Sequence, residues 1–304
     1  MSITSSTASF PQRDSIRGAP PAGERAFSIA FSAMLALGLF FALGGLAAIL
    51  IWAISAGLPR LDWGLFTNAP STARIETAGF RTAILGSLYV IAGVIALIIP
   101  IGLGTALYLE EFSVRTSRFA RLVDLNIQNL AGVPAIVFGI LGLAFIVRGP
   151  LDLGFVAAAA SMTLALLVLP TIIVSSREAI RGVPRSLKEG ALALGATPWK
   201  AVWTQVVPYA APGVLTGAIL SVARAIGEAA PLLLVGAVTF VTFNPRFWSD
   251  GYSVLPVMIY QYATRPQASF RLLAFAGVLV MLVLVLFMNS FAIWLRNRYE
   301  RPLQ

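Results

Sequence analysis

Six long apolar runs constrain this chain more than any other feature. They lie at about 27–56, 82–109, 122–147, 154–176, 208–240 and 270–295. Each is at or above the roughly 20 residues that an α-helix needs to cross a bilayer. Only 12% of the 304 residues are charged, about half the share that is usual in soluble domains. The sequence therefore predicts an all-α integral membrane protein with six transmembrane helices.

The runs also suggest how the chain is organised. Residues 1–26 are rich in Ser, Pro, Gly and Arg and are expected to form a disordered tail. We assign 27–80 to the first transmembrane helix and an outer loop, 81–295 to the core and 296–304 to a C-terminal tail. Proline removes a backbone hydrogen bond, so we expect a kink at 132–134 and a tilt or break near Pro231. The outer segments 57–81 and 241–269 are longer than plain turns, and their roles stay open.

Charge asymmetry sets the expected orientation. With both termini inside, the cytoplasmic segments hold twice as many Lys and Arg residues as the outer segments. The positive-inside rule therefore predicts that both termini are cytoplasmic. The net charge of +9 follows from the same distribution, and no basic-aromatic module indicates nucleic-acid binding.

Several kinds of chemistry are excluded by composition. The chain has no Cys and no His, which removes thiolate and imidazole metal sites and Ser-His triads. It also lacks the GxxxxGK[ST] phosphate loop, so it is not expected to hydrolyse ATP. We predict no catalytic residue and no metal site.

Two charged residues interrupt the fifth apolar run. Arg224 and Glu228 are four residues apart and would share one face of a helix, which Gly217 and Ser221 continue. Charges inside an apolar run are costly and usually face a bundle interior or a watery pathway. Arg224, Glu228 and Ser221 are therefore candidates for a substrate pathway. The alternative is that Arg224 and Glu228 only neutralise one another within the bundle.

The 177–207 loop carries a second distinctive pattern. Its EGALALGA stretch is expected to form a short helix that ends near Gly195 and Thr197-Pro198. Small side chains let another surface approach the backbone closely, and Glu189 with nearby cations can orient such a contact. A surface helix without a partner is the plainer reading of the same stretch.

This loop resembles the EAA signature of ABC-transporter permeases. In that signature a glutamate and small residues precede a glycine, an apolar stretch and a proline. The matching positions here are Glu189, Gly190, Ala191, Gly195 and Pro208, with Gly190 in place of the usual alanine. In the family this loop docks on the ATP-binding subunit. The resemblance implies an ATPase-coupling role for Glu189, Gly190, Ala191, Gly195 and Ala196.

Four further stretches resemble the phosphate-permease (PstA) family. They are YLEEF at 108–112, AGVPAIVFG at 131–139, LLVLPTII at 166–173 and ARAIGEAAP at 223–231. The resemblance implies a MetI-like fold in the bacterial cytoplasmic (inner) membrane. It implies the permease subunit of an ATP-driven, binding-protein-dependent importer of inorganic phosphate. The implied partners are a second permease (PstC-like), an ATP-binding subunit dimer (PstB-like) and an extracytoplasmic phosphate-binding protein (PstS-like). ATP and Mg would bind to the ATPase, which leaves this chain without a cofactor.

The chemistry of Arg224 and Glu228 bears on the substrate. A guanidinium matches two oxygens of phosphate or sulfate. A carboxylate repels a dianion but accepts a hydrogen bond from an oxyanion that keeps a proton, as phosphate does near neutral pH. The pair therefore favours phosphate over sulfate or molybdate. The sequence is also compatible with an ion-coupled secondary transporter or a channel, but neither class explains the 177–207 loop. A purely structural membrane subunit is a further alternative, but it leaves Arg224 and Glu228 without a use.

Overall fold

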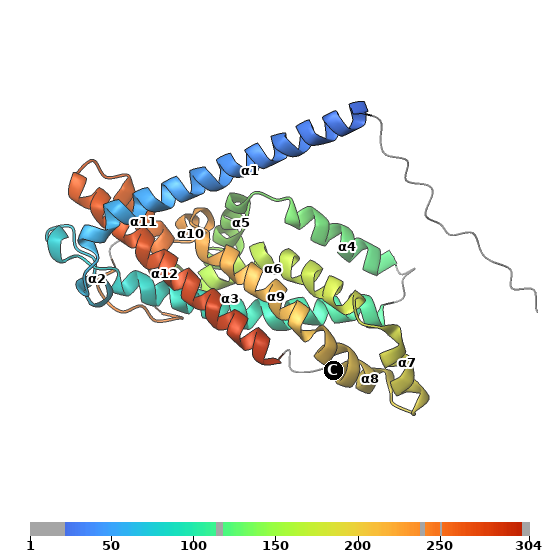
Figure 1. The fold of residues 1–304 in the computed structure, drawn as a ribbon. Helices are drawn as coiled ribbons and strands as arrows, with labels where there is room; N and C mark the ends of the chain where they lie inside the picture. Colours follow the sequence, from blue (N-terminus) through green and yellow to red (C-terminus); the bar gives the residue numbers. More distant parts are fainter. Residues whose placement is uncertain (1–21, 114–117, 238–240, 250, 300–304) are drawn as a thin grey trace, which may run out of the picture. The chain divides into compact units, whose positions relative to one another are not determined.

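The computed structural model describes residues 22–113, 118–237, 241–249 and 251–299, and it contains no β-strand within them (Figure 1). Residues 1–21, on which most of the expected N-terminal tail falls, lie outside the described part of the chain. The elements are α1 (Ala22–Gly57), η1 (Leu58–Arg60), α2 (Gly64–Thr67), η2 (Ile75–Thr77), α3 (Arg81–Leu107), η3 (Tyr108–Phe112), α4 (Arg118–Ala131), α5 (Ala135–Leu141), η4 (Gly142–Val147), α6 (Ala157–Arg181), α7 (Arg185–Ala193), α8 (Pro198–Ala201), η5 (Val202–Val206), α9 (Val207–Gly227), α10 (Ala230–Leu234), α11 (Leu255–Ala263) and α12 (Ala268–Tyr299).

The chain divides into two compact units. Residues 1–52 form the first unit, whose described part is most of α1, and residues 53–304 form the second. Five described helical stretches are long and apolar enough to cross a membrane: Phe27–Arg60, Arg81–Phe112, Ala157–Arg181, Pro198–Gly227 and Ala268–Arg298. A sixth crossing results if α4, α5 and η4 are taken together as one broken span. The predicted all-α membrane fold is therefore confirmed.

The third predicted helix is broken. The 122–147 run divides into α4 and the α5–η4 stretch, which meet at an angle of 110°. Pro134 stands at the N-terminus of α5 and has no N–H to continue the hydrogen bonding of α4. The kink predicted at 132–134 is confirmed, but one continuous helix over 122–147 is wrong. On α4, Val123 and Ile127 pack toward Ile173 of α6, while Asn126 and Gln128 remain exposed.

The core of the second unit is built around α6, which packs between α3 and α9 (Figure 1). Small side chains make this close approach possible. Ala157, Ala158, Ala159 and Ala160 at the start of α6 are all buried. The hydroxyl of the next residue, Ser161, donates to the carbonyls of Ala157 and of Val90 in α3. Further along the helix, Ser175 meets Gly217 of α9.

The 241–269 segment, expected as an outer loop, is partly buried in the core. The Ala158 N–H donates to the Phe247 carbonyl over 3.0 Å, and the Tyr252 hydroxyl donates to the Val235 carbonyl over 3.1 Å. At the start of α11 the Leu255 N–H donates to the Ser87 hydroxyl of α3 over 2.9 Å. Trp248 by contrast is 63% exposed. The described part of the segment is thus anchored to α3, α6 and the α10 region.

Candidate functional site

The first candidate site lies where α9 ends inside the fifth apolar run. α9 ends at Gly227, Glu228 is extended (φ −80°, ψ 117°), and α10 begins at Ala230. The break predicted near Pro231 is therefore confirmed and falls about three residues earlier in the chain. The expectation that Glu228 lies on the same helix as Arg224 is wrong, because Glu228 caps the end of α9 and a new helix starts at Ala230, with Pro231 in its first turn.

Arg224 and Glu228 nevertheless face one another across the helix end. Arg224 Nε lies 3.7 Å from Glu228 Oε1, and the side chains are 49% and 22% exposed. This distance defines an ion pair that is longer than a hydrogen bond. Within the described part of the chain, the two terminal guanidinium nitrogens of Arg224 form no hydrogen bond. They are available to hydrogen-bond two oxygens of an anion.

Ser221, the third residue predicted for this site, is placed differently. It is fully buried, and its hydroxyl donates to the Gly217 carbonyl one turn earlier over 2.9 Å. Such backbone bonding is common for hydroxyls in membrane helices. The structure therefore brings Arg224 and Glu228 together and leaves the Ser221 hydroxyl engaged with its own helix.

The second candidate site is the α7–α8 turn. Gly195 adopts φ +86°, a conformation that favours glycine, and the turn closes with the Gly195 and Ala196 N–H groups donating to Leu192 and Ala191. The Thr197 hydroxyl accepts from the Lys200 N–H and so caps α8. The short helix predicted over EGALALGA is confirmed. Within the expected 177–207 loop, α6 continues to Arg181, α7 covers Arg185–Ala193 and α8 begins at Pro198. The non-helical parts of this loop are therefore short.

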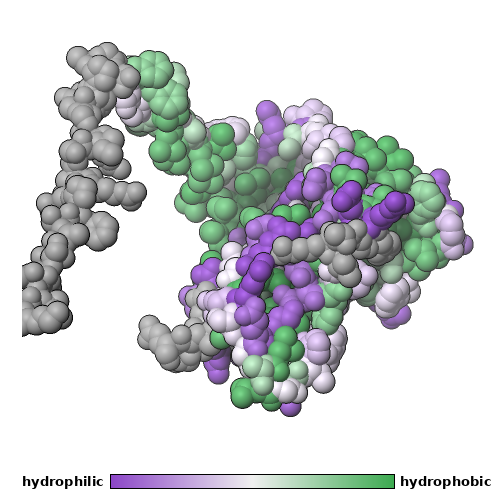
Figure 2. All heavy atoms as spheres, turned by 90° about the vertical axis from the view of Figure 1, so that its right-hand side faces the viewer, coloured by the Kyte–Doolittle hydropathy of each residue, from purple (hydrophilic) through white to green (hydrophobic). Residues whose placement is uncertain are grey.

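The α7–α8 surface is open. None of the α7 residues is buried, and a Cβ added to Gly190 would meet no atom within 4 Å. Leu194, at the turn, is 91% exposed. Figure 2 faces the end of the bundle where α7 and α8 lie and shows hydrophilic side chains gathered across it.

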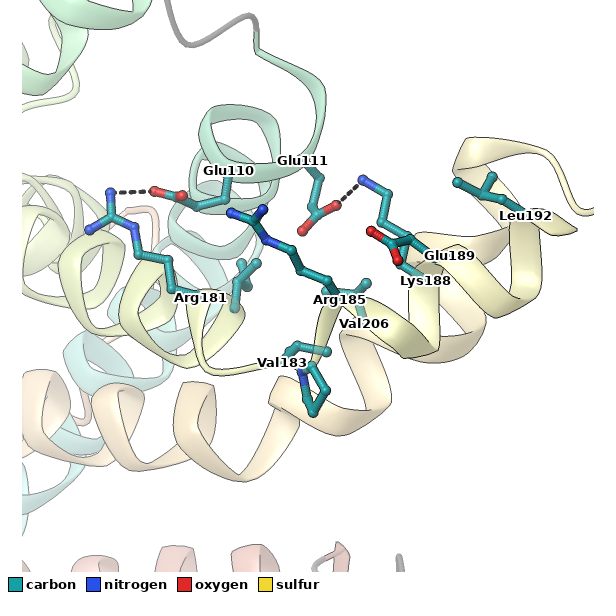
Figure 3. Close-up of a pocket in the computed structure, with 11 residues that line it drawn as sticks. Glu110, Glu111, Arg181, Val183, Arg185, Lys188, Glu189, Leu192 and Val206 are labelled. Atoms are coloured by element: carbon teal, nitrogen blue, oxygen red, sulfur yellow. Dashed lines mark hydrogen bonds and ion pairs between the residues drawn. The ribbon is translucent and has the colours of Figure 1, made fainter. Parts of the chain in front are cut away.

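A charged cavity of about 680 Å³ lies beside α7 (Figure 3). Its polar lining comes from η3, the end of α6 and α7, and consists of Glu110, Glu111, Arg181, Arg185, Lys188 and Glu189. Glu110 accepts from Arg177 Nε over 2.6 Å and pairs with Arg181 over 2.8 Å. Arg177 also binds Asp124 of α4, and Glu111 pairs with Lys188 of α7.

These ion pairs are not predicted from the sequence, in which Glu110 and Glu111 belong only to a family motif. A signal was present, because Arg177, Arg181 and Arg185 recur every four residues and two carboxylates close the apolar run 82–109. Their partners are 53 to 77 residues away in the chain, so the pairing follows from the packing of α3, α4 and α6.

Comparison with known proteins gives the class. The family model described as "Binding-protein-dependent transport system inner membrane component" matches residues 98–301. The chain belongs to this family of inner membrane transport components.

Within the family, several similar proteins are phosphate permeases by name. The "Phosphate transport system permease protein PstA" of Xylella fastidiosa (strain Temecula1) is 34% identical over 81% of this chain and 84% of its own length. The protein of the same name from Mycobacterium leprae is 33% identical over 83% of this chain and 85% of its length. The resemblance expected from ARAIGEAAP and the other stretches is confirmed.

Solved structures support the fold. A chain of a bacterial alginate ABC transporter, bound to an alginate-loaded periplasmic protein, aligns with a TM-score of 0.66 at 14% identity, over 92% of this chain and 98% of that chain. A chain of the MetNI methionine ABC transporter aligns with a TM-score of 0.57 at 18% identity, over 72% of this chain and 97% of that chain. The MetI-like fold is therefore confirmed.

Proposed function

We propose that this chain is the transmembrane permease subunit of an ATP-driven, binding-protein-dependent importer of inorganic phosphate. Relatives named as phosphate permeases cover four fifths of the chain and support this assignment. The observation that carries it is the Arg224–Glu228 pair at the break between α9 and α10. One guanidinium with free donors can hold two phosphate oxygens, while the carboxylate can accept the proton that phosphate retains.

The pair is half exposed within this single chain, which supports a pathway that a second subunit completes. We assign the role of this second subunit to a related permease of the PstC kind. Phosphate would reach the pathway from an extracytoplasmic binding protein of the PstS kind. As the phosphate enters, the Arg224 guanidinium would leave Glu228 and bind the phosphate oxygens. The Glu228 carboxylate would then accept a hydrogen bond from the protonated oxygen of the phosphate. Ser221 would act in this pathway only indirectly, by holding the end of α9 in place.

The energy would come from a separate ATP-binding subunit dimer of the PstB kind, with its own ATP and Mg. The α7–α8 turn has the properties of its docking surface: exposed α7, small residues at Gly190, Ala191, Gly195 and Ala196, and the protruding Leu194. Glu189 would add a charged contact. Both termini would then lie in the cytoplasm, as the charge asymmetry predicts.

Uptake of labelled phosphate by cells that carry the whole complex tests the substrate assignment. Arg224→Gln and Glu228→Gln are compared with wild type and with Arg271→Gln, a control at an exposed arginine of α12. We expect Arg224→Gln to lower uptake at least roughly ten-fold, because a charge-assisted hydrogen bond is lost. The Arg271 control should keep wild-type uptake, and excess sulfate should not compete.

Three results would change the assignment. Wild-type uptake in both pathway variants, at equal membrane levels, would leave the pair as a packing feature. Uptake that sulfate abolishes would move the substrate to another oxyanion. Uptake that continues when the ATP-binding subunit is deleted would favour a channel or secondary transporter.

A further inference from the structure

The end of α3 places two neighbouring carboxylates on opposite sides. η3 is a π-helical turn, and in it Glu110 points toward Arg181 while Glu111 points toward Lys188 (Figure 3). π-turns are rare and are frequent at functional sites. Glu110 and Glu111 are 11% and 13% exposed, so both carboxylates are largely withdrawn from solvent. Largely buried carboxylates require charged partners, and here each has one from a different helix.

Glu110 joins the transmembrane helices to one another. It binds Arg177 and Arg181 of α6, and Arg177 in turn binds Asp124 of α4. The four groups therefore tie the ends of α3, α4 and α6 into one charged network. A network of this kind resists separation of its helices, because breaking one pair leaves an unpaired charge in a shielded place.

Glu111 joins the same turn to α7. Lys188, 30% exposed, is its partner. α7 has no buried residue, but its partly buried Leu187 packs against the apolar cluster formed by α3, α6, η5 and α9. Among the described residues, the Lys188–Glu111 pair is the one polar side-chain contact between α7 and another element. This pair is therefore the polar link between α7 and the end of α3, beside the apolar packing of Leu187.

We infer that Glu110 and Glu111 are positioning residues that transmit displacement of α7 to α3 and α6. This inference rests on the proposed function, in which α7 docks on an ATP-binding subunit. When that subunit moves α7, Lys188 pulls on Glu111. The η3 turn, which also contains Glu110, shifts with it. Arg177 and Arg181 then carry the shift into α6, which packs against α9, the helix that carries Arg224.

The test measures coupling in the complete purified transporter, reconstituted in vesicles with its binding protein and ATPase. Two quantities are recorded: phosphate transported per ATP hydrolysed, and the amount of ATPase that co-purifies. Glu111→Gln and Lys188→Gln are compared with wild type and with the exchanged pair Glu111→Lys/Lys188→Glu. Glu178→Gln is the matched control, because Glu178 also pairs with an arginine of this region but is 65% exposed.

We expect each Gln variant to lower the transported phosphate per ATP by roughly five-fold or more, a typical coupling effect. ATPase association should stay at the wild-type level. The exchanged pair should restore the ratio to within about two-fold of wild type, since the attraction is re-formed. The Glu178 control should match wild type.

An unchanged ratio in both Gln variants would overturn the inference, and so would failure of the exchanged pair to restore a lowered ratio. If the Gln variants do not assemble, Lys188→Arg and the exchanged pair carry the test. A wild-type ratio of phosphate to ATP in Lys188→Arg and in the exchanged pair supports the inference. A lowered ratio in both of these variants overturns it. Wild-type complex that neither binds the ATPase nor moves phosphate would instead refute the proposed function, which keeps the two failures distinct.

Discussion

Gly217 of α9 lies directly against Ser175 of α6. A Cβ added to Gly217 would stand 2.5 Å from the Ser175 Cβ and closer still to its hydroxyl. One turn earlier, a Cβ on Gly213 would come 2.6 Å from the Ala179 Cβ. The two helices therefore cross at a distance that only glycine permits on the α9 side. This crossing sets the position of α9, the helix that carries Arg224 in its last turn.

Gly217→Ala is expected to destabilise the bundle. The added methyl group has no room, and overpacking of this kind costs about 1–3 kcal/mol. Gly104→Ala in α3 is the matched control, because a Cβ there meets no atom within 4 Å. Thermal unfolding of both variants in detergent measures the difference. Equal melting temperatures for Gly217→Ala and wild type would show that α6 and α9 separate more easily than this packing implies.

Arg224→Lys is expected to lower phosphate uptake although it keeps the positive charge, and so to show whether the shape of the guanidinium matters. Lysine keeps the positive charge but offers no two-pronged fork for an oxyanion. Phosphate uptake should fall by roughly ten-fold, with most of the effect in the KM for phosphate, because a charge-assisted hydrogen bond is lost. Arg271→Lys should behave like wild type. Full activity of Arg224→Lys would show that positive charge alone suffices at this position.

Leu194→Asp is expected to weaken assembly without harming the fold. Leu194 is 91% exposed, so its replacement removes no packing within this chain. A carboxylate at the centre of a docking surface would cost several-fold to a hundred-fold in affinity. Co-purification of the ATP-binding subunit measures this loss, and Leu61→Asp, in the segment between α1 and α3, is the control. Normal ATPase recovery with Leu194→Asp would place the docking surface elsewhere.

Tyr252→Phe is expected to change how stability depends on pH. Burial raises the pKa of Tyr252 above its ordinary value of 10.0 and raises the pKa of Tyr262 to about 12. Above about pH 10 the unfolded chain loses the Tyr252 proton and the folded chain keeps it. The unfolded state then binds fewer protons, so stability falls by about 1.4 kcal/mol per pH unit for this group.

Phenylalanine has no hydroxyl proton to lose, so the stability of the variant should not fall above pH 10 through this group. Near neutral pH it should instead be less stable than wild type by about 1 kcal/mol, because the bond to the Val235 carbonyl is gone. Unfolding measured at pH 8 and pH 11 should show the difference between wild type and variant narrow or reverse. Tyr209→Phe, at a more exposed tyrosine, is the control. A constant difference across this range would contradict the prediction.

Much of the fold follows from the sequence because apolar length and proline act locally. The runs at 82–109, 154–176 and 270–295 became helices, and Pro134 and Pro231 mark the two breaks. The sharpness of the first break could not be predicted. A proline explains why a helix stops, whereas the angle of 110° depends on how α4 packs against α6.

The candidate site was predictable in part for the same reason. Arg224 and Glu228 were found because charge inside an apolar run is costly, and spacing placed them together. Glu228 lies just past the end of α9, where helical spacing no longer determines the direction of its side chain. The link from Glu111 to Lys188 joins residues 77 positions apart, and no local pattern can state which distant carboxylate a lysine meets.

One continuous stretch of helix, Pro198–Gly227, runs from the exposed α7–α8 turn to the break beside Glu228. At 1.5 Å per residue it is about 45 Å long. Such a rod acts as a lever: a tilt of about five degrees at one end moves the other by roughly 4 Å. Arg224 and Glu228 both lie at the far end of this rod, so a modest tilt would carry the pair as a unit past the helices α3 and α6 that α9 packs against.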